Sequence, residues 1–145
     1  MIKPECREFV EALLNEDLVT AKSLTATADI NASCIEGGWT ALHLMAEHNV
    51  LESARFLLEN GANPNQTDDA GWTPLHLSLD SAVDCITQTD LLGDGAFSTF
   101  DMAALLLSYG ADPNARTKKG QTPLDLVTSH PKATELLKQH GATVE

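Results

Sequence analysis

Apolar residues recur along most of the chain at the three- and four-residue spacing of amphipathic helices. Stretches of this kind cover residues 6–15, 18–25, 51–60 and 100–109. Each stretch has the length of about two to three helical turns. The pattern therefore predicts short helices that bury one side against neighbouring helices.

One seven-residue segment occurs three times. GWTALHL at residues 38–44 returns as GWTPLHL at 71–77 and, with two changes, as GQTPLDL at 120–126. The first two copies start 33 residues apart and the next two start 49 residues apart. A period of this size is the mark of a repeat protein, in which each unit packs on its neighbours.

A second segment keeps step with the first. LLENGANPN at 57–65 matches LLSYGADPN at 106–114. Between the two segments, the later unit carries 16 extra residues, at about 82–97. Loops of this length are uncommon in compact domains, so the insertion is either an extra contact arm or short helix, or a loop packed on its own unit.

Both segments contain signals that begin and end helices. Thr40 and Thr73 are suited to cap a helix N-terminus, and Pro74 suits the first helical position. Gly61 and Gly110 suit the left-handed position that ends a helix. Each unit is thus predicted to contain a helix, a second helix and a turn.

These boxes resemble those of the ankyrin-repeat family, with its Gly-x-Thr-Pro-Leu-His and Leu-Leu-x-x-Gly-Ala segments. The resemblance implies an all-α solenoid of helix-turn-helix units with projecting β-turns, formed by a single domain over residues 1–145. The chain departs from the family at Ala41 and at 49–50. The expected units are an N-terminal cap at 5–34, a second repeat at 35–67, a third repeat at 68–116 with the insertion at about 82–97, and a C-terminal cap at 117–145.

The formal net charge is −12, and the surplus of acid is uneven. Residues 56–115 contain nine acidic residues and no Lys or Arg, whereas 116–145 contain five basic residues and three acidic ones. A long segment without bases disfavours binding to nucleic acid or to an anionic membrane. A protein partner with a basic surface patch is expected instead; the alternative is that the charge only maintains solubility.

Other classes of site find little support. Cys6, Cys34 and Cys85 are far apart and in no CxxC pair, so reduced thiols are expected, with neither a disulfide nor a zinc site. No metal or other cofactor is expected, and no membrane span or signal peptide is evident. A cytoplasmic protein that is monomeric without its partner is the resulting expectation.

The two tryptophans and two of the histidines hold equivalent positions. By the resemblance, Trp39 and Trp72 face the concave binding surface; the alternative is that they only pack on the next turn. Exposed Trp is a favoured interface anchor. His43 and His76 are expected to hydrogen-bond neighbouring repeats and not to act as catalytic bases.

Further contact positions follow from the resemblance, on the turns, the ends of the first helices and the insertion. The predicted face is acidic in its middle and basic at one end. The partner-binding residues predicted in this way are Glu36, Trp39, Glu47, His48, Thr67, Asp69, Trp72, Asp80, Ser81, Asp84, Asp90, Asp94, Arg116, Lys118, Lys119 and Gln121.

The sequence thus predicts a non-enzymatic protein that binds another protein and inhibits it by covering its working surface. One version is an acidic immunity protein that neutralises a bacterial toxin. The other is an adaptor or regulatory inhibitor, resembling small ankyrin kinase inhibitors, whose acidity is incidental. An enzyme is the distant alternative, because no phosphate-binding loop or serine elbow is present.

Overall fold

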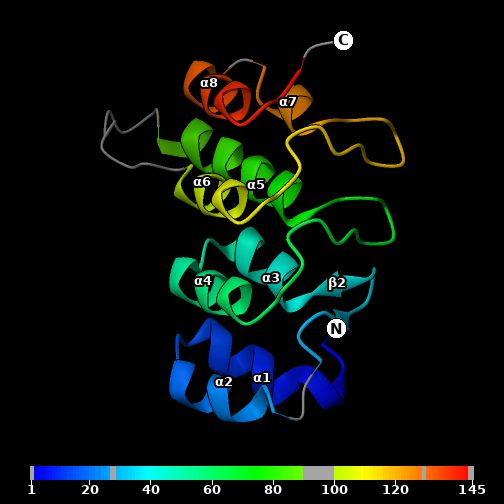
Figure 1. Ribbon diagram of the computed structural model, residues 1–145, viewed down its shortest axis with the longest axis vertical. Helices are drawn as coiled ribbons and strands as arrows, with labels where there is room; N and C mark the ends of the chain where they lie inside the picture. Colours follow the sequence, from blue (N-terminus) through cyan, green and yellow to red (C-terminus); the bar gives the residue numbers. More distant parts are fainter. Residues whose placement is uncertain (1, 27–28, 90–99, 129, 144–145) are drawn as a thin grey trace.

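The fold is a stack of helix pairs from which turns project to one side (Figure 1). The computed structural model describes residues 2–26, 29–89, 100–128 and 130–143, with the backbone alone for 83–89. Pairs follow one another from the N-terminus to the C-terminus along the long axis. The described helices are α1 (Pro4–Leu14), α2 (Leu18–Leu24), α3 (Ala41–His48), α4 (Leu51–Glu59), α5 (Pro74–Thr89), α6 (Asp101–Ser108), α7 (Pro123–Leu126) and α8 (Pro131–Gln139).

The first helix of each later unit begins at a threonine cap. The Oγ1 of Thr40 accepts the backbone N–H of His43 at the start of α3, and Thr122 accepts that of Asp125 in α7 in the same way. These bonds satisfy N–H groups that lack a partner inside the helix. The predicted caps at Thr40 and Thr73 are confirmed, since the Thr73 Oγ1 also accepts the backbone N–H of His76, at 3.4 Å. The cap at Thr122 is an addition to them.

Left-handed residues end the helices. Gly61 and Gly110 follow α4 and α6 with φ of 97° and 96°, which a residue without a Cβ adopts without strain. Asn49 takes the same role after α3, with φ of 57°. Asn tolerates this conformation better than other side chains, which explains why the departure from the family at this position leaves the helix end intact.

The core lies between successive helix pairs. Leu42 and Met45 of α3, Leu75 and Leu79 of α5, and Leu106 of α6 are all fully buried. Burial of each such side chain stabilises the fold by about 1.5–3 kcal/mol. The expected all-α ankyrin solenoid is confirmed, with one small addition at the N-terminal end.

That addition is a short antiparallel ladder of β1 (Ser33–Ile35) and β2 (Trp39–Thr40). Ile35 pairs with Trp39 on one side and with Ile2 on the other. The backbone N–H of Lys3 also donates to the Cys34 carbonyl, at 2.8 Å. The chain start therefore covers one edge of the first projecting turn.

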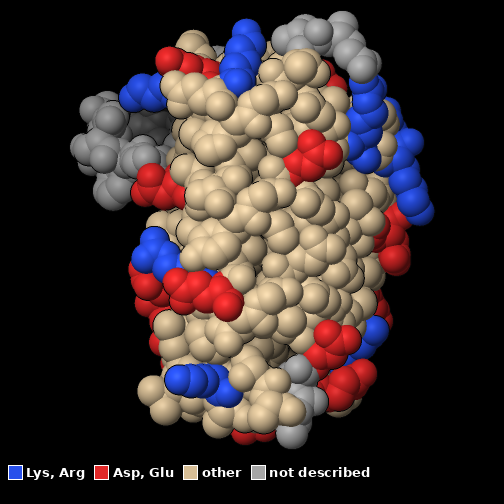
Figure 2. Space-filling model, in the orientation of Figure 1, with Lys and Arg blue, Asp and Glu red and all other residues tan. Residues whose placement is uncertain are grey.

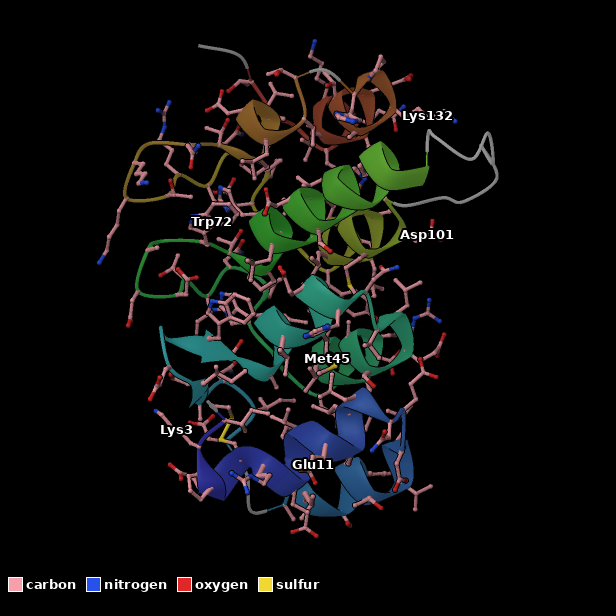
Figure 3. All side chains as sticks on the ribbon, turned by 180° about the vertical axis from the view of Figure 1, so that it is seen from behind. Lys3, Glu11, Met45, Trp72, Asp101 and Lys132 are labelled. Atoms are coloured by element: carbon pink, nitrogen blue, oxygen red, sulfur yellow. A yellow bond between two sulfur atoms is a disulfide. The ribbon has the colours of Figure 1, made fainter. Side chains whose placement is uncertain are left out.

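The expectation of reduced thiols is wrong for two of the three cysteines. Cys6 of α1 and Cys34 of β1 form a disulfide, with Cα atoms 5.5 Å apart (Figure 3). Their separation of 28 residues gives no local signal, because only the packing of α1 against β1 brings them together. Disulfides persist mainly in oxidising compartments. The disulfide therefore does not support the predicted cytoplasmic location, which stays a prediction.

The insertion also differs from expectation in its first part. Instead of ending near residue 82, α5 continues to Thr89. No Gly and no second Pro occur between Pro74 and Thr89, so nothing in that stretch stops the helix. Residues 90–99, with the expected turn at 93–95, lie outside the described part. Within the described ranges, no helix is both long enough and apolar enough to cross a membrane.

Candidate protein-binding surface

Three projecting turns stack on one another: the first turn (33–40), the middle turn (67–72) and the last turn (116–121). The Asp69 N–H of the middle turn donates to the Gly37 carbonyl at 2.8 Å. The Lys118 N–H of the last turn donates to the Ala70 carbonyl at 3.0 Å. Each turn is therefore held by its neighbour through its backbone.

Glycines allow this close approach. A Cβ on Gly38 would lie 2.6 Å from Asp69 Oδ1, and a Cβ on Gly71 would lie 2.7 Å from the Lys118 nitrogen. Both distances are below any ordinary contact of a Cβ. At Gly71 the contact is with backbone, so a side chain there would push the turns apart, whereas at Gly38 the closest atom is the end of the Asp69 side chain and the Asp69 backbone nitrogen lies at 3.0 Å. The glycine that precedes Trp39 or Trp72 is thus needed for stacking as well as for its positive φ.

Asp68 organises the middle turn. Its Oδ1 accepts the N–H groups of Ala70 and Trp72, both at 2.9 Å, and its Oδ2 accepts the indole N–H of Trp39 at 2.9 Å. The resemblance to the ankyrin-repeat family predicts Asp69 as a contact residue and gives Asp68 no separate role. The repeat contains a signal for this role, because Asp68 lies three residues before Gly71. Thr117 lies three residues before Gly120 in the same way, and its Oγ1 accepts the Gln121 N–H at 3.2 Å.

The tryptophans lie at the base of the turns. Trp39 is half-buried, bonded to Asp68 and stacked on His43, with ring centroids 6.4 Å apart. Trp72 is half-buried and packs at a tilt on His76, at 5.7 Å (Figure 3). Trp39 therefore does pack on the neighbouring turn. Each indole is also partly accessible, so that a partner could contact it.

His43 and His76 join consecutive units. In each, Nδ1 accepts the N–H of the threonine cap, at 3.1 Å from Thr40 and 3.2 Å from Thr73. A ring that accepts at Nδ1 carries its proton on Nε2, which donates to the next turn: His43 to the Trp72 carbonyl at 3.0 Å, and His76 to the Gln121 carbonyl at 3.1 Å. Burial lowers the pKa of both imidazoles, and the bonds to these carbonyls partly offset it.

Asparagines lock the opposite side of each unit, a feature absent from the sequence-based expectations. The Asn65 side chain donates to the Gly110 carbonyl at 3.0 Å and accepts the Asp112 N–H at 2.6 Å. Asn31 makes the same two bonds to Gly61 and Asn63, and Asn114 makes them to Gly141 and Thr143. The units are thus fixed to one another on two sides, which gives the turns a rigid base.

Charged side chains lie at the ends of the turns. Glu36 and Asp69 are exposed on the first and middle turns, and Arg116, Lys118 and Lys119 are exposed on the last turn. Figure 2 shows Lys and Arg gathered over the uppermost projecting turn, with acidic residues below it. Glu36, Asp69 and Lys118 hold equivalent places in the stack, so the predicted change of sign along this surface is present.

The remaining predicted residues fall into three groups. Thr67 is exposed on the middle turn and Gln121 is half-buried on the last turn. At the ends of the first helices, the Ser81 hydroxyl donates to the Glu47 carbonyl at 2.8 Å, and His48 and Asp80 are exposed. The Asp84 side chain, Asp90 and Asp94 lie outside the described part. Among the described residues, no three His, Cys, Asp or Glu side chains are grouped to hold a metal ion.

Family comparison identifies the repeat. A family model for ankyrin repeats, in three copies, matches residues 4–90, and a single ankyrin-repeat model matches 70–118. Neurogenic locus notch homolog protein 4 of Homo sapiens is 52% identical over 48 residues, which are 33% of this chain and 2% of that protein. The neurogenic locus Notch protein of Drosophila melanogaster is 38% identical over 68 residues, 45% of this chain and 2% of that protein.

A shorter relative is also similar. Protein phosphatase 1 regulatory subunit 27 of Homo sapiens is 32% identical over 71 residues, 48% of this chain and 46% of that protein. The chain thus spans less than half the length of each of these three relatives. Ankyrin repeats form protein–protein interaction modules, and the stacked turns and paired helices are those of such a repeat. This chain belongs to the ankyrin-repeat family.

Proposed function

We propose that this chain binds a partner protein along its three turns and the ends of its first helices, and inhibits that partner by covering its working surface. The observation that carries the proposal is the rigid stack of turns with exposed acidic residues on the first and middle turns. Such a preformed surface loses little conformational freedom on binding. No catalytic step is part of the proposal.

Charge and shape define the partner. Glu36 and Asp69 lie one unit apart and match a basic patch, which complementary charge would steer into place. The accessible parts of Trp39 and Trp72 would provide apolar anchors at the base of the same surface. Asp84, Asp90 and Asp94 would extend the acidic side through the insertion.

Two versions of this inhibition are open to test. In one, the chain is an immunity protein, and its acidic middle binds a basic toxin domain and neutralises it. Residues 56–115, which contain nine acidic residues and no Lys or Arg, support this version. In the other, the chain is a regulatory inhibitor, as its similarity to a protein phosphatase 1 regulatory subunit suggests. A toxin gene beside the gene for this chain would favour the first version, and a captured signalling enzyme would favour the second.

Charge reversal tests the surface. In affinity capture from the native source, the Glu36→Lys/Asp69→Lys variant is expected to retain at least tenfold less partner than the wild type. Glu8→Lys/Glu11→Lys is the matched control, because it changes net charge equally on exposed sites of α1. Equal retention by both variants and the wild type would place the binding surface elsewhere.

A second measurement separates charge from contact. With the captured partner purified, the association rate constant is expected to fall steeply as salt is raised from low to physiological ionic strength. Trp39→Phe/Trp72→Phe should instead increase the dissociation rate constant, because it changes the apolar contact without changing charge. A salt-independent association rate would contradict the electrostatic part of the proposal.

A further inference from the structure

The three turns carry equivalent glycines in nearly the same conformation, with φ of 81° at Gly38, 81° at Gly71 and 79° at Gly120. Gly38 and Gly71 lie under the next turn, at the close distances given above. Gly120 is exposed, and no atom of the described residues lies within 4 Å of a Cβ placed there. The last turn therefore has the shape of a stacking position on which no other turn stacks among the described residues.

The backbone acceptor of this position is also open. The carbonyls of Gly37 and Ala70, each just before the stacked glycine, accept an N–H from the next turn. The corresponding carbonyl of the last turn belongs to Lys119, and no N–H of the described residues donates to it. A row of acceptors that ends without a partner can be extended by another chain, as at the edge of a sheet.

The contact between the first and middle turns shows one residue that such an edge accepts; the edge of the middle turn accepts the N–H of Lys118 in the same way. Asp69 donates its N–H to the Gly37 carbonyl, and its carboxylate lies directly over Gly38. An aspartate in a turn thus fits both the acceptor and the space above the glycine. On the first turn the neighbouring side chain is Glu36, of the same sign, whereas the last turn presents exposed Lys118 and Lys119.

We propose that the C-terminal edge of the last turn, formed by the Lys119 carbonyl and Gly120, is a docking edge for an acidic loop of the bound partner. One N–H of the loop donates to the Lys119 carbonyl, an aspartate lies over Gly120, and its carboxylate pairs with Lys118 or Lys119. The inference rests on the proposed function, because the loop is assumed to belong to the partner that this chain inhibits. That partner would then carry a basic patch for the first and middle turns and an acidic loop for the last.

The edge can be tested without the partner. The probe is a cyclic peptide that carries residues 65–73 of this chain, the acidic turn that already occupies such an edge. A second peptide has only Asp69 changed to lysine, because Asp68 holds the backbone of the turn. Titrating each into the full chain labelled with ¹⁵N, we expect the amide signals of Lys119 and Gly120 to shift with the acidic peptide, and the lysine peptide to bind at least tenfold more weakly.

Two variants locate the binding. Gly120→Asn keeps a side chain that tolerates positive φ but fills the space over the edge, so it is expected to abolish the shifts while the thermal midpoint shows that the chain is folded. Lys118→Glu/Lys119→Glu should weaken binding at least tenfold. Lys132→Glu/Lys138→Glu, on exposed sites of α8, is the control of equal charge and should bind the acidic peptide within twofold of the wild type.

Other outcomes would overturn the inference. Equal affinity for the two peptides, or shifts centred on Gly38 in place of Gly120, would show that the last turn is no docking edge for acidic loops. Sedimentation showing dimers that Gly120→Asn dissolves would assign the edge to a second copy of this chain. The peptide titration uses no partner, so its failure is distinct from a failure of the Glu36→Lys/Asp69→Lys capture experiment.

Discussion

The first and last turns have the same backbone path but differ in what covers their outer edges. The first turn is closed on its N-terminal side by the pairing of Ile2 with Ile35, by the Lys3–Cys34 hydrogen bond and by the Cys6–Cys34 disulfide. The last turn has no such cover among the described residues at Gly120. One end of the stack is sealed by a covalent bond, and the other is accessible.

The helices behind these turns differ in the same direction. α1 is 11 residues long and buries Phe9, Val10 and Leu13, whereas α7 is four residues long. In a solenoid each unit is stabilised mainly by its neighbours, so a short terminal unit has less to hold it. The comparison predicts that the N-terminal end of the described stack is more stable than the end formed by α7 and the last turn.

The largest expected effect comes from opening the sealed end. Reducing the disulfide, or replacing Cys6 with Ser, should lower the free energy of unfolding by about 3–4 kcal/mol, the loop-closure value for a bridge of this span. Urea denaturation with and without reductant measures the difference. Thiol titration should find one thiol per unreduced chain and three after reduction.

A matched variant controls this result. Cys6→Ser should be insensitive to reductant, because its bridge is already absent. If the wild type has the same stability with and without reductant, the first turn is held by packing and backbone hydrogen bonds alone. The two ends of the stack would then differ only in the lengths of α1 and α7.

The second prediction compares a covered glycine with an open one. Gly71→Ala and Gly120→Ala both place a Cβ at positive φ, at a cost of about 1–2 kcal/mol each. Only Gly71→Ala also forces a Cβ to 2.7 Å from the Lys118 nitrogen, which should add about 1–3 kcal/mol through displacement of the turn. Urea denaturation of the two variants measures the difference; equal losses would mean that the last turn moves away freely.

The repeat explains why much of the fold could be predicted from the sequence. Apolar spacing and terminal glycines are local signals, so the helices α4 and α6, which have no threonine cap, begin and end within one residue of the segments expected for them. The extension of α5 to Thr89 does not follow from the repeat period; its local signal is the absence of Gly and of a second Pro in that stretch.

Features that depend on contacts between distant segments could not be predicted. Cys6 and Cys34 give no pairing signal in the sequence because their contact depends on the angle at which α1 packs against β1. Asp68 and Asp69 are chemically identical neighbours, yet the first accepts the hydrogen bonds that hold the turn, whereas the second is exposed and lies over Gly38. The charged ends of the turns were predictable, since each follows from a position counted within the repeat.

The third prediction uses pH to compare the two joints of the stack, His43 between the first and middle turns and His76 between the middle and last. Burial lowers the pKa of both below the ordinary value, so the unfolded chain binds protons first as pH falls. The contribution of the two neutral histidines to the free energy of unfolding is therefore fully present above about pH 7.5. The free energy of unfolding should fall by about 1–2 kcal/mol on lowering pH to 5.5, with a limiting slope of about 1.4 kcal/mol per pH unit for each histidine.

Single replacements assign this slope. His43→Gln and His76→Gln should each remove about half of the loss seen by urea denaturation between these pH values, if the stack unfolds as one unit. A smaller share for His76 would show that the last unit opens on its own, which would sharpen the contrast between the ends. A stability that is constant down to pH 5.5 would contradict the neutral state of both rings in the fold.

The smallest expected difference between two sites concerns the residue that organises each turn. Asp68→Ala removes the acceptor for three donors, including the Trp39 indole, whereas Thr117→Ala removes the acceptor for the Gln121 N–H alone. Because water can reach the half-buried middle turn, we expect the former to cost about 1.5–2 kcal/mol and the latter about 0.5–1 kcal/mol. Urea denaturation measures both. In Asp68→Ala, the fluorescence emission of Trp39 should also change while the helices remain, since its indole loses its hydrogen bond to the middle turn. An unchanged spectrum would mean that stacking on His43 alone holds the ring.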